Sequence, residues 1–188
     1  MTNEEKYKWW AIALLAVGGV ALLIRTQGNP LSQIINSMNT NPKLPRGYRN
    51  NNPLNIRLSI WNAWQGKVLP NTDGSFEQFS DMAYGYRAAL KLIRKYIKQG
   101  HNTVAKIINR WAPESDGNYT QAYIDHVCEF ANLNRDMVIN PNDRDTITAM
   151  VRAMSIIENG TKDKDGNNLQ SEYNLPNMET INQGWDVL

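Results

Sequence analysis

The sequence predicts a mainly α-helical protein in which one compact domain follows an N-terminal transmembrane helix. Four stretches between residues 80 and 160 repeat apolar residues at intervals of three and four, the spacing of one helix face. Residues 9–24 form an unbroken run of apolar residues and glycine. The roughly 160 residues after that run are enough for one domain with a hydrophobic core.

The N-terminal run, Trp9 to Ile24, is interpreted as an uncleaved membrane anchor. Lys8 precedes it, Arg25 follows it, and flanking aromatic residues extend it into the membrane interface. A cleaved signal peptide is the rival interpretation, but no small-x-small cleavage site follows the run. We therefore expect residues 1–26 to anchor the chain in a lipid bilayer and the polar stretch 27–44 to act as a tether.

Charge and cysteine content limit the classes of function. The net charge of +2 is too small to indicate nucleic-acid binding. Cys128 is the only cysteine, and neither His101 nor His126 has the spacing of a metal site, so we expect no disulfide, metal or cofactor. Basic residues concentrate between 87 and 110, which fits either a solvated helix face or a surface for an anionic cell-wall glycan.

The stretch from residue 46 to residue 57 reads RGYRNNNPLNIR and is dense in side-chain amides and arginines. Asn-Pro marks a loop, and amide groups suit the N-acetyl and hydroxyl groups of a sugar, although a structural turn is equally consistent. Trp61 and Trp64 follow; their rings can stack on sugars or pack in the core. Ser75–Phe79 alternates like a short strand.

Four helices are expected after this region. The first is capped by Ser80 or Asp81 and stops at Gly100. The second is capped by Asn102 and ended by Pro113, and the third spans about 120–132. The fourth spans 143–160, with Asn142 or Asp143 as its cap and Gly160 at its end. Residues 163–168 form a turn that lacks the spacing of a calcium loop, and the polar segment after it is expected to be an irregular terminus.

The fourth helix carries the candidate catalytic residue, Glu158. Its apolar stripe consists of Ile147, Met150, Val151 and Met154, and Glu158 falls four residues later on the same stripe. A carboxyl group among apolar side chains at the negative end of a helix is favoured in its neutral form and can act as a general acid. The alternative is a helix that frays before Glu158, which then points into water.

These motifs together resemble a known family. Residues 46–57 resemble the R-G-x-R-N-N-N-P-G-N-I-R signature of phage and prophage virion-associated proteins with a lysozyme-like domain. Further blocks follow in the family's order, namely Phe76-x-x-Phe79, Met82 to Ala88, Thr103 with Trp111 to Pro113, Tyr123-Ile124 and Glu158 to Gly160. The similarity covers about residues 45–160. Leu54 stands where the family usually has glycine, a residue that permits unusual backbone angles.

The resemblance implies a lysozyme-like domain over residues 45–162, followed by a C-terminal extension over 163–188. Relative to transglycosylases of the lysozyme superfamily, the loop comes first and the Glu-bearing helix last, as in a circular permutation. That order would bring Glu158 beside the 50–57 loop. The substrate-binding residues it implies are Asn50, Asn52, Asn55 and Arg57 in the loop, and Tyr84, Tyr119 and Tyr123 along the cleft.

The leading hypothesis is a membrane-anchored, virion-associated peptidoglycan lytic enzyme that cleaves the β-1,4 bond between N-acetylmuramic acid and N-acetylglucosamine. Glu158 would act as general acid and then as base. A hydrolase of the lysozyme type usually needs a second carboxylate, for which Asp73, Glu77, Glu114 and Asp116 are weak candidates. A lytic transglycosylase, which can use one carboxylate, is therefore favoured.

Two alternatives stay open. One is a non-catalytic structural protein of a membrane-containing phage virion that binds the wall. The other is a murein peptidase on the same scaffold, which the missing metal-ligand set and Cys/His pair disfavour. The expected partners are peptidoglycan glycan strands, the lipid bilayer through Trp9–Ile24 and other virion proteins, but not nucleic acid. The expected location is the virion's internal membrane or the host inner membrane, with the domain facing the cell wall.

Overall fold

The computed structural model describes residues 41–186 and 188, and this part of the chain is mainly helical, as predicted. Its elements are α3 (Arg46–Arg49), α4 (Met82–Lys98), α5 (Val104–Trp111), the 3-10 helix η1 (Glu114–Asp116), α6 (Thr120–Ala131), α7 (Arg144–Asn159), α8 (Leu169–Tyr173) and α9 (Met178–Asp186). Strand pairing in the described residues is limited to isolated bridges, such as Arg57 with Phe76 and Lys67 with Phe79. The strand predicted over Ser75–Phe79 is therefore wrong, because its residues pair singly and form no ladder.

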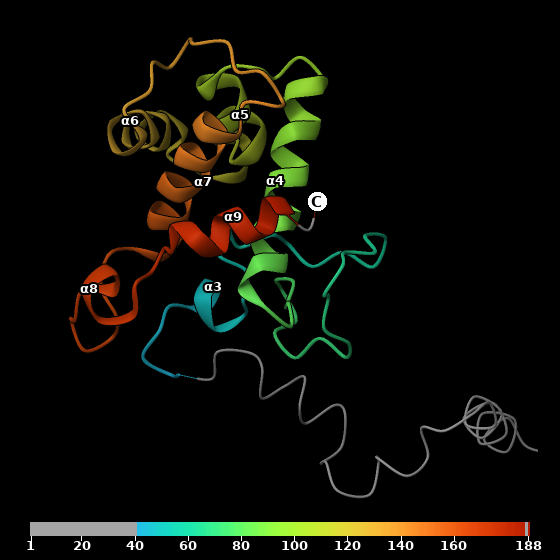
Figure 1. Cartoon of the computed structure of the whole chain (residues 1–188), viewed down its shortest axis with the longest axis vertical. Helices are drawn as coiled ribbons and strands as arrows, with labels where there is room; N and C mark the ends of the chain where they lie inside the picture. The colour runs from blue at the N-terminus through green and yellow to red at the C-terminus, as the bar shows by residue number, and fades with distance from the viewer. Residues whose placement is uncertain (1–40, 187) are drawn as a thin grey trace, which may run out of the picture. The chain divides into compact units, whose positions relative to one another are not determined.

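The long helix α4 is in contact with α5, α7 and α9, while α6 packs on α5 and α7 (Figure 1). The predicted inner face of α4 is confirmed, since Tyr86, Leu90 and Ile93 are fully buried. The apolar stripe of α7, from Ile147 to Met154, is buried as well. Burial of each large apolar side chain contributes about 1.5–3 kcal/mol, so these faces hold the helices together.

Two predicted helix caps are confirmed and one is wrong. The carboxylate of Asp81 accepts a hydrogen bond from the Ala83 amide, and that of Asp143 accepts one from the Thr146 amide. The second helix is capped by the hydroxyl of Thr103, not by Asn102. Asn102 lies one residue too early, and its backbone carbonyl accepts a hydrogen bond from the amide of Ile139.

The C-terminal residues are helical and pack on the core, so the expectation of an irregular terminus is wrong. Ile181 of α9 is fully buried, and the indole nitrogen of Trp185 donates to the Thr148 hydroxyl at 2.8 Å. Figure 1 shows α9 crossing α4 and α7. Helices α8 and α9 belong to the same compact unit as α3 to α7.

The proposed anchor, Trp9–Ile24, and most of the 27–44 tether lie outside the described residues. No helix within the described part is long and apolar enough to span a bilayer. The last residues assigned to the tether are described, and they pack on the domain. Leu44 is buried against Tyr48 and Leu169, and the Lys43 ammonium forms an ion pair with Asp165.

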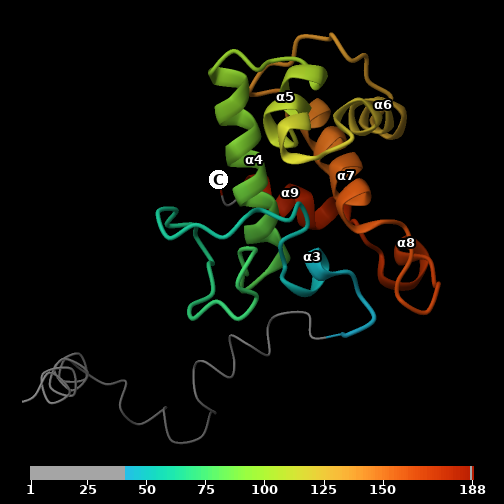
Figure 2. The ribbon, with the colours of Figure 1, turned by 180° about the vertical axis from the view of Figure 1, so that it is seen from behind.

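A helix-free segment from residue 50 to residue 80 passes over α4 on the side away from α9 (Figure 2). Gly85 of α4 permits this crossing, because a Cβ at that position would overlap with the backbone carbonyl oxygen of Asn51. Asn51 and Asn55 adopt left-handed φ angles of 50° and 48°, which asparagine tolerates. Leu54 is not among the positive-φ residues, and its side chain is buried in the core.

The side chain of Asp73 joins this segment to α3 through hydrogen bonds and an ion pair. Its carboxylate accepts hydrogen bonds from the Arg46 guanidinium at 2.6 and 2.7 Å and from the Asn50 amide at 2.7 Å. Burial opposes ionisation, but these bonds and those from the amides of Phe76 and Ser75 outweigh it and hold the pKa of Asp73 well below its ordinary value of 3.8.

We expect Asp73→Asn to cost about 1.5–3 kcal/mol of stability at pH 7, the usual value of hydrogen bonds to a charged group. Because the folded pKa is depressed, this contribution is complete above the ordinary pKa of 3.8 and is lost as the pH falls towards the lowered value. Urea unfolding at pH 7 and at pH 2 should show the two proteins converging at low pH. Asp125→Asn, at an exposed site, is the control. If the free energies of unfolding of wild type and Asp73→Asn differ by the same amount at pH 7 and at pH 2, this account is wrong.

Candidate functional site

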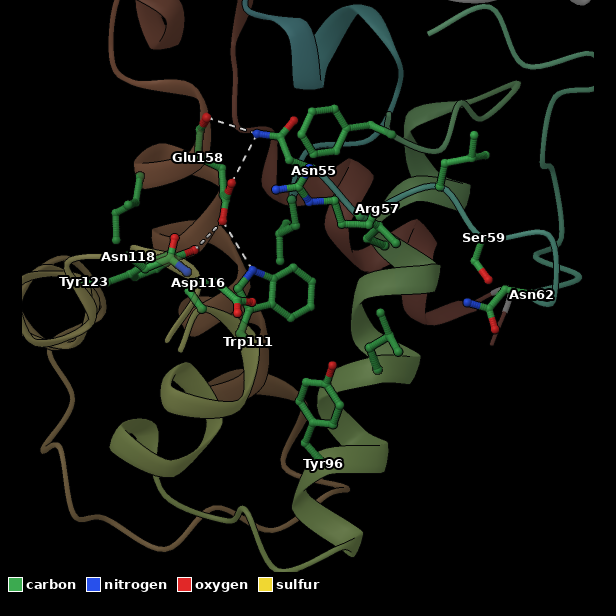
Figure 3. A pocket seen from close by; sticks show the side chains of 17 residues that line it. Asn55, Arg57, Ser59, Asn62, Tyr96, Trp111, Asp116, Asn118, Tyr123 and Glu158 are labelled. Atoms are coloured by element: carbon green, nitrogen blue, oxygen red, sulfur yellow. Dashed lines mark hydrogen bonds between the residues drawn. The ribbon is translucent and has the colours of Figure 1, made fainter. Parts of the chain in front are cut away.

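A cavity of about 600 Å³ lies between α5, α6, the end of α7 and the segment from Leu54 to Asn62 (Figure 3). Its polar lining consists of Asn55, Arg57, Ser59, Asn62, Tyr96, Trp111, Asp116, Asn118, Tyr123 and Glu158. Apolar side chains such as Ile56, Leu92 and Ile157 complete the wall. A concave surface with a few convergent polar groups is the usual form of a ligand site.

Glu158 lies in the last turn of α7, which continues to Asn159 and does not fray earlier. Its side chain is half-buried, and its carboxylate receives three hydrogen bonds (Figure 3). Oε1 accepts from the Tyr123 hydroxyl at 2.9 Å and from the Trp111 indole nitrogen at 3.2 Å. Oε2 accepts from the Asn55 side-chain amide at 3.1 Å. Three separate parts of the chain thus converge on this one carboxylate.

The two carboxylate oxygens differ in what they can still bind. A carboxylate has about two acceptor positions on each oxygen. Oε1 uses both of its positions on Trp111 and Tyr123, whereas Oε2 uses one on Asn55. A proton on Oε1 would take one of the two positions that Trp111 and Tyr123 occupy, whereas Oε2 has a position free. A proton on Glu158 would therefore be carried by Oε2.

Tyr123 and Trp111 owe their positions to helices α6 and α5. The aromatic ring of Tyr123 packs against the hydrophobic core, as does that of Trp111 at the last residue of α5. Burial and the neighbouring Glu158 carboxylate raise the pKa of the Tyr123 phenol well above its ordinary value of 10.0. Tyr123 thus keeps its proton at all ordinary pH values and acts as a hydrogen-bond donor.

Asn55 reaches Glu158 because hydrogen bonds hold its loop against the end of α7. Its side-chain amide also donates to the backbone carbonyl of Glu158 at 3.2 Å, and its backbone amide donates to the carbonyl of Asn52. A Cβ at Gly47 would overlap with the side-chain oxygens of Asn55 and Asn159, so glycine is required for this approach. Asn159 in turn donates to the carbonyl of Pro53 at 2.7 Å, which ties the loop to the end of α7.

Asn50 and Asn52, predicted to bind substrate, are buried within the loop and do not line the cavity. Asn52 donates to the carbonyls of Ile56 and Glu77 and accepts from the Ile56 amide. Asn50 bonds to Asp73 and accepts from the Gln78 amide. In this structure both side chains bond to other parts of the chain.

Of the other predicted binding residues, Arg57 and Tyr123 line the cavity together with Asn55. The exposed guanidinium of Arg57 lies 5.0 Å from the centroid of the Phe76 ring, a cation–π contact that holds it at the cavity wall. Tyr84 packs against the core and does not line the cavity. Tyr119 is 89% exposed and lies in an adjacent depression that shares Asn118 with the cavity.

Asp116 is the carboxylate that lines the cavity together with Glu158 in the described part of the chain. Glu77 is fully buried in an ion pair with Lys67, and Asp73 is bonded to Arg46. Glu114 lies in the adjacent depression. The described residues contain no group of three or more His, Cys, Asp or Glu side chains that could hold a metal ion.

Sequence reasoning did not identify Trp111, Asn118 or Asn62 as site residues. Trp111 occupies an apolar position of α5, so its spacing predicted core packing alone. Its N–H points to Glu158 only because α5 and α7 meet at this end of the domain. Asn118 and Asn62 lie in loops, whose positions helical periodicity does not predict.

Comparison with models of known protein families finds no match. The sequence is similar to Protein P5 of Pseudoalteromonas phage PM2, with 37% identity over 119 residues. The aligned region covers 62% of this chain and 72% of the phage protein, so the similarity extends over most of that relative.

Proposed function

The chain belongs to the family of Protein P5 of Pseudoalteromonas phage PM2, and from the Glu158 site we propose that it is a phage enzyme that cleaves peptidoglycan. The bond cut is the β-1,4 linkage between N-acetylmuramic acid and N-acetylglucosamine. The observation that carries this proposal is the half-buried Glu158 carboxylate in a polar cavity, with one acceptor position left open. A single positioned carboxyl group suits general acid–base chemistry.

In the proposed reaction the carboxyl group of Glu158 gives its proton from Oε2 to the oxygen of the glycosidic bond. The bond to the muramic acid carbon then breaks, and the N-acetylglucosamine hydroxyl leaves. The resulting carboxylate removes a proton from the 6-hydroxyl of the muramic acid, whose oxygen closes on the same carbon to form the 1,6-anhydro ring. Trp111 and Tyr123 keep the other oxygen an acceptor throughout.

The remaining lining suits a polar sugar. Arg57 offers a guanidinium at the cavity wall, and Asn62 and Asn118 offer side-chain amides that can bond to acetamido and hydroxyl groups. Asn55 is better assigned to the positioning of Glu158, because its amide nitrogen already donates to that residue twice.

Product analysis tests the proposal. Purified peptidoglycan is digested with the full-length chain in detergent, and the soluble fragments are identified by mass spectrometry. We expect anhydro-muropeptides, the product of a transglycosylase. Fragments with reducing ends would instead indicate a hydrolase, for which Asp116 is the second carboxylate to test. If no glycan fragment appears, the proposal is wrong.

We further propose that the helical domain is of the lysozyme type with a permuted order of elements. The end of α7 beside the Asn-rich loop supports this assignment, which still rests on analogy. In this proposal the segment Trp9–Ile24 anchors the chain in the virion's internal membrane or the host inner membrane, beside other virion proteins. The domain then faces the cell wall.

The second candidate function is a non-catalytic wall-binding protein of the virion. It is favoured by one observation, namely that Glu158 is already bonded to three donors from its own chain, as a carboxylate with a purely structural role would be. Sedimentation of the chain with intact peptidoglycan that releases no fragments would favour this function over cleavage.

If Glu158 is catalytic, Tyr123→Phe should lower kcat about tenfold and leave KM nearly unchanged. The change removes one hydrogen bond to Oε1, worth about 1 kcal/mol, and frees that oxygen to take up the proton. Rates of muropeptide release measure the effect. Tyr173→Phe is the matched control, because it removes a phenol that bonds to Asp163 and does not line the cavity. Equal loss in both variants would contradict a role for Tyr123 at the site.

A further inference from the structure

Two consecutive large apolar residues are exposed in the turn between Ser59 and Asn62, which both line the cavity. Ile60 is 83% exposed and Trp61 is 88% exposed. A single exposed apolar residue is common, but two adjacent large ones at a loop tip indicate a contact surface. Trp64, three residues later, instead packs against the core. The two tryptophans of this region therefore have different roles.

The loop that carries this pair is fixed at its base by a buried ion pair. The Lys67 ammonium bonds to the Glu77 carboxylate at 3.0 Å and to the carbonyl of Ser59 at 2.6 Å, and it also reaches the carbonyl of Asn62 at 3.5 Å. The amide of Ser59 donates to the same Glu77 oxygen at 3.0 Å. One cation thus holds both ends of the turn that presents Trp61.

Both ends of this turn also belong to the cavity. Ser59 and Asn62 line it, and Figure 3 shows them on the opposite side of the view from Glu158. Trp61 lies between them in sequence, is exposed, and is not itself part of the lining. A ligand that extends beyond the cavity past Ser59 and Asn62 would therefore come close to this indole ring.

We propose that Trp61, together with Ile60, forms a platform on which a glycan strand stacks a sugar ring outside the Glu158 cavity. The choice of a glycan rests on the proposed function. Tryptophan presents a wide apolar face with a polar edge, which suits the C–H face of a sugar ring. The hydroxyl of Ser59 and the amide of Asn62 beside it can bond to sugar hydroxyl groups.

Charge argues against a lipid surface as the ligand. Segments that lie on membranes combine apolar residues with Lys and Arg. The stretch from residue 58 to residue 66, LSIWNAWQG, has no charged side chain. Of the two cations that flank it, Lys67 is occupied in the ion pair with Glu77, and the Arg57 guanidinium lies against the Phe76 ring. A neutral sugar polymer is the better match.

Binding of chitin oligosaccharides of two and six sugars tests the platform. The full-length chain is used in detergent with Glu158→Gln in every protein, so that binding is measured without cleavage. Trp61→Ala should weaken binding of the hexasaccharide about three- to tenfold and leave that of the disaccharide unchanged. Trp61→Phe should keep most of the affinity. Phe130→Ala, at an exposed aromatic residue outside the cavity, should have no effect.

Several results would overturn the platform. These are unchanged hexasaccharide binding by Trp61→Ala, an equal loss for both lengths, or no binding of either sugar by any protein. A lipid contact is tested separately in vesicles of brominated phosphatidylcholine. If bromine quenches the fluorescence difference between wild type and Trp61→Phe, Trp61 lies in the bilayer and the proposal is wrong.

The platform and the proposed cleavage can fail independently. Length-dependent binding without any release of muropeptides would retain the platform and refute the enzyme. Release of muropeptides, together with hexasaccharide binding that does not depend on Trp61, would support the enzyme and refute the platform.

Discussion

Glu158→Gln should lower the rate of muropeptide release by about 10²- to 10⁴-fold, the usual contribution of a general acid–base group. The amide has nearly the same shape as the carboxyl group but cannot give up a proton at neutral pH. Its oxygen can still accept from Tyr123 and Trp111. Its nitrogen would face the Asn55 amide nitrogen, so this one hydrogen bond is lost, while Asn55 keeps its bond to the backbone carbonyl of residue 158.

Stability separates this loss of chemistry from a loss of fold. We expect the free energy of unfolding of Glu158→Gln to stay within about 1 kcal/mol of wild type, because only one hydrogen bond is lost. Glu129→Gln, at an exposed position of α6, is the matched control and should change neither rate nor stability. If Glu158→Gln releases muropeptides at the wild-type rate, Glu158 is not the catalytic residue. If it binds the wall but releases none, and neither does wild type, wall binding is the stronger candidate.

Lys67→Met should destabilise the domain by about 3–5 kcal/mol, the usual cost of removing one partner from a buried ion pair. The Glu77 side chain is fully buried, and one of its oxygens, Oε2, already has no hydrogen-bond partner. Without the ammonium, a negative charge would lie in the interior beside a single backbone amide, that of Ser59. Urea unfolding measures the change.

The double variant Lys67→Met/Glu77→Gln distinguishes charge burial from lost packing. It should recover more than half of the stability lost in Lys67→Met, since no uncompensated charge is left. Arg135→Met, which removes an exposed pair with Asp125 at 3.9 Å, should cost less than about 1 kcal/mol. A double variant as unstable as Lys67→Met would mean that the methylene chain of Lys67, and not its charge, supports the loop.

The four long helices could be predicted because their signals are local. The apolar spacing of α7 and the cap at Asp143 depend on residues a few positions apart. The cap of α5 was misplaced by one residue, because Asn102 and Thr103 are both good caps and only the pairing of Asn102 with Ile139 separates them. Helix α9 was missed because its contact depends on α4, far away in the sequence.

The candidate site could be predicted only in part. Glu158 was identified because a carboxylate on an apolar stripe is unusual, and Asn55, Arg57 and Tyr123 lie with it around the cavity. Asn50 and Asn52 have the same chemistry as Asn55, and the sequence does not show which amides bond to their own loop. The contact of Trp111 with Glu158 joins two helices, so no local pattern could predict it.

The hydrogen bond from Trp111 to Glu158 also means that the fluorescence of Trp111 can report on the state of the cavity. An indole whose N–H is bonded to a carboxylate emits differently when that carboxylate gains a proton or turns towards a ligand. Trp111 lines the same cavity, so a bound molecule changes the surroundings of the ring directly. Comparison of the wild-type spectrum with that of Trp111→Phe would isolate this signal, and occupancy of the site could then be followed by ultraviolet fluorescence without a label.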